Sequence, residues 1–313
     1  MTVFGHDAQT SAFRAAIANN RLHHAWLLTG PRGIGKARFA EAILGSLLDG
    51  EHDARLLAAG NHPDVYRLER LTNEKTGTLA RSIVVDQVRW LRERLTTATA
   101  LGGRRVVIID AVDDLEGRGG PNALLKSLEE PPASTVFLLI SHAPGRLLPT
   151  IRSRCRTLAF AALDDAGMQR ALTDALPNLS EGERDALIVG ARGIPAVAIA
   201  SAALEMTAIE ATLQAIAAKG DPSNALRGQL AQVLSTKASQ PRYEAFVARV
   251  PTFIAEAARV AQGNALVRAL DAWHRARTFA AIALSQSLVA ETVVFELAGQ
   301  VAALADSGAD AKA

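Results

Sequence analysis

The sequence predicts an α/β domain with a parallel sheet, followed by a region made only of helices. Three apolar runs lie between amphipathic segments of the first 160 residues, at 25–29 (AWLLT), 106–110 (VVIID) and 135–141 (TVFLLIS). Such runs are typical of strands that helices cover on both faces, and their alternation with helices indicates a parallel sheet. A further short strand is expected at 157–160, and after residue 161 good helix formers dominate.

Turn residues divide the chain into three predicted domains. The α/β domain covers 1–161, a small helical domain covers 162–206, and a larger helical domain covers 207–313. The small domain is interrupted at Gly193, where a tight turn can start a new helix. The last eight residues, 306–313, carry little apolar surface, and we expect them to fray.

The composition excludes several classes of protein. Thirty-four basic and 32 acidic residues leave a net charge of +2, which argues against a histone-like tail or an acidic solvating segment. A single cysteine excludes an internal disulfide and a multi-thiolate metal site built from this chain alone. The first nine residues lack the features of a secretory signal, and no apolar stretch is long enough to span a bilayer. We therefore expect a cytoplasmic protein without a membrane segment.

A glycine-rich loop follows the first apolar run directly, and a predicted amphipathic helix follows the loop. The loop reads 30–36 (GPRGIGK) and contains Gly30, Gly33, Gly35 and Lys36. Backbone N–H groups in such a loop can cradle phosphates, while the lysine ammonium reaches the outer phosphates. The pattern predicts a phosphate-binding P-loop, with an ordinary turn as the alternative.

Two groups that an active P-loop ATPase needs are missing. Ala37 stands where such proteins place a Ser or Thr hydroxyl on Mg²⁺. Asp110 ends the second run with a carboxylate that can serve a metal, but Ala111 follows where related ATPases carry a Glu that polarises water. Asp113 is expected on another face of the turn. The sequence predicts a loop that has kept its fold and lost hydrolysis, with weak or no nucleotide binding.

Three arginines crowd one turn after the third apolar run, at Arg152, Arg154 and Arg156. A planar guanidinium suits a phosphate, either of a nucleotide on a neighbouring subunit or of DNA. A solvated basic turn is the simpler alternative. Cys155 lies among them and is expected to be a small core residue, because no histidine accompanies it in a recognisable pattern.

Three histidines are weaker candidates. His23 and His24 are adjacent at the first strand, where neighbouring side chains point to opposite faces and cannot share a metal. His62 opens a His-Pro-Asp turn that leads into a strand. No metal site is predicted.

Four stretches together resemble the clamp-loader subunits of bacterial DNA polymerase III, an AAA+ family. They are 24–36 (HAWLLTGPRGIGK), 62–64 (HPD), 122–132 (NALLKSLEEPP) and 148–155 (LPTIRSRC), and they occur in the family's order and spacing over about the first half of the chain. The resemblance implies an AAA+ α/β domain with a helical lid, followed by a helical collar that joins a five-membered ring of subunits.

The resemblance also implies roles for individual residues. Arg154, in the Ser-Arg-Cys motif, would act as an arginine finger in the ATP site of an adjacent motor subunit. The motor subunits carry Ser or Thr, an acid and a lid arginine where this chain has Ala37, Ala111 and Ala196. These departures favour a non-catalytic member whose partners are the motor (gamma/tau) and delta subunits and, through the complex, the sliding clamp and primed DNA. ATP is expected in the adjacent subunit, and no cofactor is assigned to this chain.

One departure concerns zinc. Subunits of this type usually carry a four-cysteine zinc module before the His-Pro-Asp turn, and residues 47–61 contain no cysteine. We therefore predict no zinc.

Two other functions remain open. A self-sufficient AAA+ ATPase, such as a motor subunit, is disfavoured by Ala37 and Ala111. A DNA-binding module acting through the three arginines is disfavoured by the near-neutral charge and by an aromatic content of only 4%.

Overall fold

The computed structural model describes residues 4–48, 50–73, 77–117, 119–286 and 288–305. These residues form two compact units, Met1–Ala198 and Ile199–Ala313, which are described separately below. The first unit contains the sheet together with the first helices after residue 161. The three-domain division, with boundaries at 161 and 206, stays a prediction.

Five parallel strands form the sheet of the first unit, in the order β2-β3-β4-β1-β5. The three predicted runs form β1 (Ala25–Thr29), β3 (Arg105–Asp110) and β4 (Thr135–Ser141) at the centre. The edge strands are β2 (Val65–Glu69) and β5 (Arg156–Ala159). The α/β prediction with a parallel sheet is confirmed.

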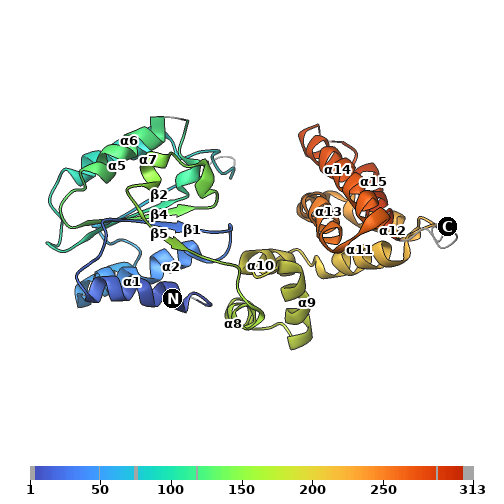
Figure 1. The fold of residues 1–313 in the computed structure, drawn as a ribbon, viewed down its shortest axis with the longest axis horizontal. Helices are drawn as coiled ribbons and strands as arrows, with labels where there is room; N and C mark the ends of the chain where they lie inside the picture. Colours follow the sequence, from blue (N-terminus) through green and yellow to red (C-terminus); the bar gives the residue numbers. More distant parts are fainter. Residues whose placement is uncertain (1–3, 49, 74–76, 118, 287, 306–313) are drawn as a thin grey trace. The chain divides into compact units, whose positions relative to one another are not determined.

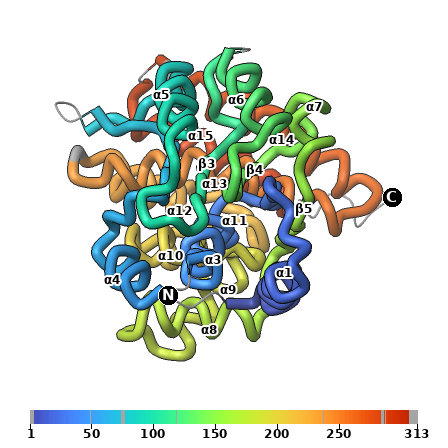
Figure 2. Tube along the Cα trace, turned by 90° about the vertical axis from the view of Figure 1, so that its left-hand side faces the viewer, coloured from blue at the N-terminus to red at the C-terminus, as the bar shows by residue number. Residues whose placement is uncertain are grey.

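Helices cover both faces of this sheet, which is why the central strands are apolar except at their ends (Figures 1 and 2). The helices are α1 (Asp7–Ala18), α2 (Lys36–Ala42), α3 (Leu44–Leu47), α4 (Glu51–Ala58), α5 (Val85–Leu95), α6 (Gly119–Glu129) and α7 (Pro149–Arg152). Leu28 and Leu138 pack with α1 to α3 on one face. Leu27 and Leu139, one residue away, pack with α5 to α7 on the other. Successive strand residues alternate between two cores, so each must be apolar.

The strand register determines which loops lie together at the carboxyl ends of the strands and which lie together at the amino ends. Thr29 at the end of β1 pairs with Ser141 at the end of β4, and Asp110 at the end of β3 pairs with Ile140. The glycine-rich loop and Asp110 therefore meet at the edge formed by the carboxyl ends of the strands, where α/β proteins bind ligands. The beginning of β5 lies at the opposite edge, because Arg156 pairs with Trp26.

Three helices follow the sheet: α8 (Asp165–Ala175), α9 (Glu181–Ala191) and α10 (Pro195–Ala203). The first is capped by Asp164, whose side chain accepts a 2.7 Å hydrogen bond from the Gly167 N–H. The second begins at a capping box of Ser180 and Glu183. These caps satisfy N–H groups that have no partner inside their helix.

The second unit is a bundle of helices around one apolar core. Leu213, Phe246, Val250 and Leu297 in this core are fully buried. The helices are α11 (Thr207–Lys219), α12 (Ala225–Leu234), α13 (Gln240–Val260), α14 (Gly263–Ser285) and α15 (Ala290–Ala302). All regular elements described after residue 161 are thus helical, as predicted, and the expected fraying of 306–313 lies outside the described residues.

Among the described helices none is by itself both long and apolar enough to cross a membrane, whereas α10 and α11 meet that criterion only together, as a bent pair.

Candidate functional site

The loop between β1 and α2 adopts a positive-φ conformation, which favours glycine, at Gly30, Gly33 and Gly35. Gly30 has φ +144° and Gly33 has φ +81°. A Cβ on Gly30 would lie 2.2 Å from the carbonyl oxygen of Phe160, and one on Gly33 would lie 2.6 Å from the Cβ of Ala196. The loop glycines are therefore required by protein packing as well as by any approach to a phosphate.

Lys36 folds back onto this loop. Its Nζ donates to the carbonyl oxygens of Gly30 and Pro31, both at 2.6 Å, and the residue is only 3% exposed. Burial lowers the pKa of its amine to about 8, and the nearby carboxylates of Asp110 and Asp113 offset only part of that effect. Two of the three ammonium donors are thus engaged by the chain itself.

The lysine should titrate at an unusually low pH. We expect the Lys36 amine to lose its proton with a midpoint of about pH 8, against 10.5 for an ordinary lysine. The unfolded chain then binds more protons than the folded one between these values, so this group's contribution to the free energy of unfolding rises with pH across that window. NMR of ¹³C-labelled lysine, assigned by the signal lost in Lys36→Arg, measures the midpoint, and a value above about 10 would contradict burial of the charge.

Asp113, beside the loop, makes hydrogen bonds that hold two segments of the chain together. Both carboxylate oxygens of Asp113 are occupied, one by the Ser141 hydroxyl at 2.9 Å and the other by the backbone N–H of His142 at 2.5 Å. Asp113 thereby ties the turn after β3 to the end of β4, away from the position of Ala111. Ala111 itself is 2% exposed and offers only a methyl group.

A cavity of about 390 Å³ lies over the loop, lined in part by Lys36, Asp110, His142 and Ala196. The His142 Nε2 atom is 3.9 Å from Asp110, and burial, followed by the charges of Lys36 and Arg32, lowers the pKa of this imidazole. Sequence reasoning missed His142, although its place directly after the third apolar run puts it at the same edge as the loop.

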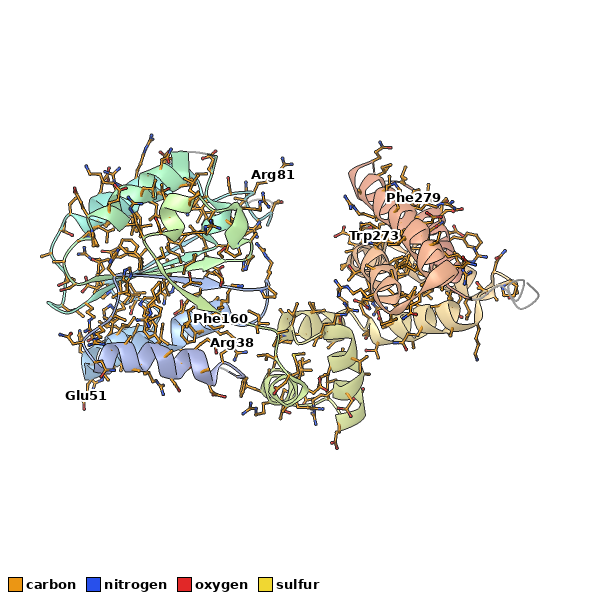
Figure 3. The ribbon with its side chains drawn as sticks, viewed as in Figure 1. Arg38, Glu51, Arg81, Phe160, Trp273 and Phe279 are labelled. Atoms are coloured by element: carbon orange, nitrogen blue, oxygen red, sulfur yellow. The ribbon has the colours of Figure 1, made fainter. Side chains whose placement is uncertain are left out.

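The residues at this edge do not fit a magnesium–nucleotide complex. Ala37 cannot coordinate the metal and Ala111 cannot polarise a water molecule. The first helices after the sheet also bind the loop region directly: the Ala196 N–H donates to the Gly33 carbonyl at 3.3 Å, and Arg38 pairs with Asp174 of α8 at 3.2 Å. Figure 3 shows Arg38 and Phe160 at the border of the sheet from which the chain continues into α8.

The three predicted arginines are close in sequence but have separate partners. Arg154 Nη2 lies 2.7 Å from the Glu129 carboxylate, and Arg154 Nη1 donates to the Thr150 carbonyl at 2.9 Å. Arg152 donates to the Pro144 carbonyl at 3.3 Å, whereas the Arg156 guanidinium lies 4.9 Å from the centre of the Trp26 ring. The side chain of Arg154 keeps 34% of its surface exposed.

Arg154 lies at the edge of the sheet opposite its own glycine-rich loop. Arg154 precedes by two residues the first residue of β5, Arg156, which pairs with Trp26 near the start of β1. The glycine-rich loop follows Thr29, at the other end of β1. Thr29 lies three residue steps along β1 from Trp26, which at about 3.3 Å per step amounts to roughly 10 Å. The guanidinium therefore lies away from the glycine-rich loop of its own chain.

Cys155 and the paired histidines have structural surroundings. Burial raises the pKa of the Cys155 thiol to about 12, so the nucleophilic thiolate is not formed near neutral pH. The rings of His23 and His24 are stacked with centroids 4.3 Å apart, so the expectation that they point to opposite faces is wrong. Both precede Ala25, where β1 begins, and strand alternation does not apply to them.

His62 connects its turn to α4. Its Nδ1 accepts a 3.1 Å hydrogen bond from the Asp64 N–H, so its Nε2 carries the proton and donates to Asp53 at 3.1 Å. This contact lies in the segment where the resemblance would place a zinc module. In the part of the chain that the structure describes, no group of three metal-ligating side chains is found.

The fold and this edge of the sheet define the class of protein. A parallel sheet of order β2-β3-β4-β1-β5, a glycine-rich loop after β1 and helices packed on that loop are the features of an AAA+ P-loop module. The model of the family described as "DNA polymerase III, delta subunit" matches residues 5–164. The chain belongs to this family.

Individual relatives agree with that assignment. The chain is 43% identical over 185 residues to the delta′ subunit of DNA polymerase III from Pseudomonas aeruginosa, which is 56% of this chain and 54% of the relative. It is 38% identical over 153 residues to the delta′ subunit from Escherichia coli, 45% of this chain and 43% of the relative. The recognition of a clamp-loader subunit of the delta′ type is confirmed, and the chain spans about half the length of the curated relatives it matches.

Two further matches are more distant. The tau/gamma subunit from Haemophilus influenzae is 32% identical over 184 residues, 56% of this chain and 25% of the relative. The crystal structure of a DNA polymerase III gamma subunit-related protein from Thermotoga maritima superposes with a TM-score of 0.50 at 16% identity, covering 94% of this chain and 98% of the other. This second match concerns the fold alone.

Proposed function

We propose that this chain is a non-catalytic subunit of the DNA polymerase III clamp loader. In this proposal it helps to load the sliding clamp onto primed DNA, and it donates Arg154 as an arginine finger to the ATP site of an adjacent motor subunit. The delta′ and tau/gamma names of its relatives support a clamp-loader role. The partners would be the gamma/tau and delta subunits in a five-membered ring, acting in the cytoplasm.

The observation that carries this proposal is the contrast between the two edges of the sheet. At the carboxyl edge, the loop lysine is bonded to its own loop, and alanines stand at the positions for the metal ligand and the catalytic acid. At the opposite edge, the side chain of Arg154 is 34% exposed. A phosphoryl-transfer site gains from a guanidinium supplied by a neighbour, because it stabilises the charge of the transition state.

The isolated chain is expected to show no ATP hydrolysis above background, because it lacks the metal ligand and the acid. Steady-state ATPase of the purified chain tests this, followed by the same assay after addition of the motor and delta subunits, clamp and primed DNA. No ATP hydrolysis by the isolated chain, together with ATP hydrolysis by the complete mixture, would support the proposal. Turnover by the lone chain that Lys36→Ala abolishes would instead establish a motor-type ATPase, the function suggested by the tau/gamma matches.

A further inference from the structure

We infer that Glu129 is the positioning residue of Arg154: its carboxylate holds the guanidinium in the orientation in which it meets the neighbour's phosphate. The inference rests on the proposed finger role of Arg154 and adds a second residue to the same site. Glu129 is the last residue of α6, and it is 25 positions away from Arg154 in the sequence. The pair is therefore made by the fold and not by local sequence.

The guanidinium is held from two directions. Glu129 Oε1 accepts from Nη2 at 2.7 Å, while the Thr150 carbonyl of α7 accepts from Nη1 at 2.9 Å, with a longer 3.5 Å contact to the Ser153 hydroxyl. An arginine has five N–H groups in a rigid plane. The described contacts use two or three of them, so the others stay available to the oxygens of a phosphate while both anchors are kept.

The backbone that carries Glu129 is itself fixed. Leu128 is 1% exposed, and its carbonyl accepts a 3.1 Å hydrogen bond from the His24 ring, directly before β1. Pro131 and Pro132 follow and prevent the helix from continuing. A continuous series of contacts thus runs from the central strand through the end of α6 to the guanidinium of Arg154.

Holding the side chain in place has a physical advantage. A long exposed arginine samples many rotamers, and a group that must stabilise a transition state loses that freedom when it binds. A side chain that is already ordered loses less, so more of its interaction contributes to the rate. The Glu129 carboxylate also reduces the net positive charge around Arg154. If ordering of the side chain dominates, replacing Glu129 slows hydrolysis; if the reduction of charge dominates, replacing Glu129 speeds hydrolysis.

The test uses the complete complex, reconstituted with this chain, the motor and delta subunits, clamp and primed DNA. With Glu129→Ala we expect kcat for hydrolysis at the adjacent site to fall about 3- to 10-fold while KM for ATP stays unchanged, because the finger acts in the transition state; the phosphate burst of one round of clamp loading resolves this site from the others. Glu129→Gln keeps an acceptor oxygen and should restore kcat to within about 2-fold of the wild type. An unchanged or increased kcat in Glu129→Ala would overturn the inference.

Two controls separate this inference from the proposed function. Glu130→Ala removes the same charge one residue along the chain and should leave kcat unchanged; a loss equal to that of Glu129→Ala would point to general charge and overturn the inference. In an Arg154→Ala background, Glu129→Ala should have no further effect. If Arg154→Ala slows hydrolysis and Glu129→Ala does not, only the positioning role of Glu129 is refuted. If Arg154→Ala leaves the hydrolysis rate unchanged, both proposals are refuted.

Discussion

Replacing Arg154 by alanine is expected to abolish rapid hydrolysis at one ATP site of the complete complex while the complex still assembles. An arginine finger supplied by a neighbour contributes about 10³- to 10⁵-fold to the rate of phosphoryl transfer. The side chain is partly exposed at the rim, so its loss should not unfold the domain. The other ATP sites continue to hydrolyse ATP, so the measurement is the burst of phosphate released in one round of clamp loading. The amplitude of this burst should decrease by the amount that one ATP site contributes.

Two variants make this result specific. Arg154→Lys keeps the positive charge but loses the planar fork, and it should recover only a small part of the burst. Arg152→Ala is the matched control, because Arg152 lies two residues away and is bonded to the Pro144 carbonyl. A full burst in Arg154→Ala would refute the finger role, and an equal loss in Arg152→Ala would indicate a general effect of basic charge on DNA binding.

Gly30→Ala is expected to cause the largest loss of stability of the variants considered. The added methyl group would meet the Phe160 carbonyl oxygen at 2.2 Å, in a backbone conformation with φ +144° that other residues rarely adopt. A steric clash with backbone combined with this strain should lower the free energy of unfolding by roughly 3 to 5 kcal/mol. Urea unfolding, followed by circular dichroism without nucleotide, measures the change.

Gly102→Ala provides the control for backbone strain alone. Gly102 has φ +74°, and a Cβ there would meet no heavy atom within 4 Å, so only the conformational cost of about 1 to 2 kcal/mol applies. Equal losses in the two variants would show that the loop moves away from Phe160 at little cost. A much larger loss at Gly30, measured without nucleotide, would show that packing against Phe160 requires the glycine even when no phosphate is bound.

The sheet was predictable because its central strands are buried on both faces. Runs such as 106–110 are apolar except at their last residue, Asp110, and are therefore recognised as strands without knowledge of their neighbours. The edge strand β5 begins one residue earlier than the expected 157–160 and is mostly exposed, so its sequence carries a weaker signal. Tertiary contacts decide the ends of such strands, and sequence patterns do not contain them.

The site was predictable only in part. Lys36 and Asp110 follow strands whose carboxyl ends meet, so parallel topology brings them together. The partners of the arginines could not be read from their spacing, because Glu129 reaches Arg154 from another helix and Trp26 reaches Arg156 from another strand. His142 was missed because no local motif marks it, although it follows the third apolar run directly.

The hydrogen bond from Ala196 to the Gly33 carbonyl has a consequence for how this unit responds to the energy state of the cell. A ligand changes a conformation only to the extent that it binds one conformation better than another. Here the Lys36 amine, which would donate to phosphate oxygens, already donates to the carbonyls of Gly30 and Pro31, so a nucleotide would gain little by displacing these contacts. We therefore expect the shape of this unit, and the surface it presents, to stay constant as the cellular ratio of ATP to ADP changes.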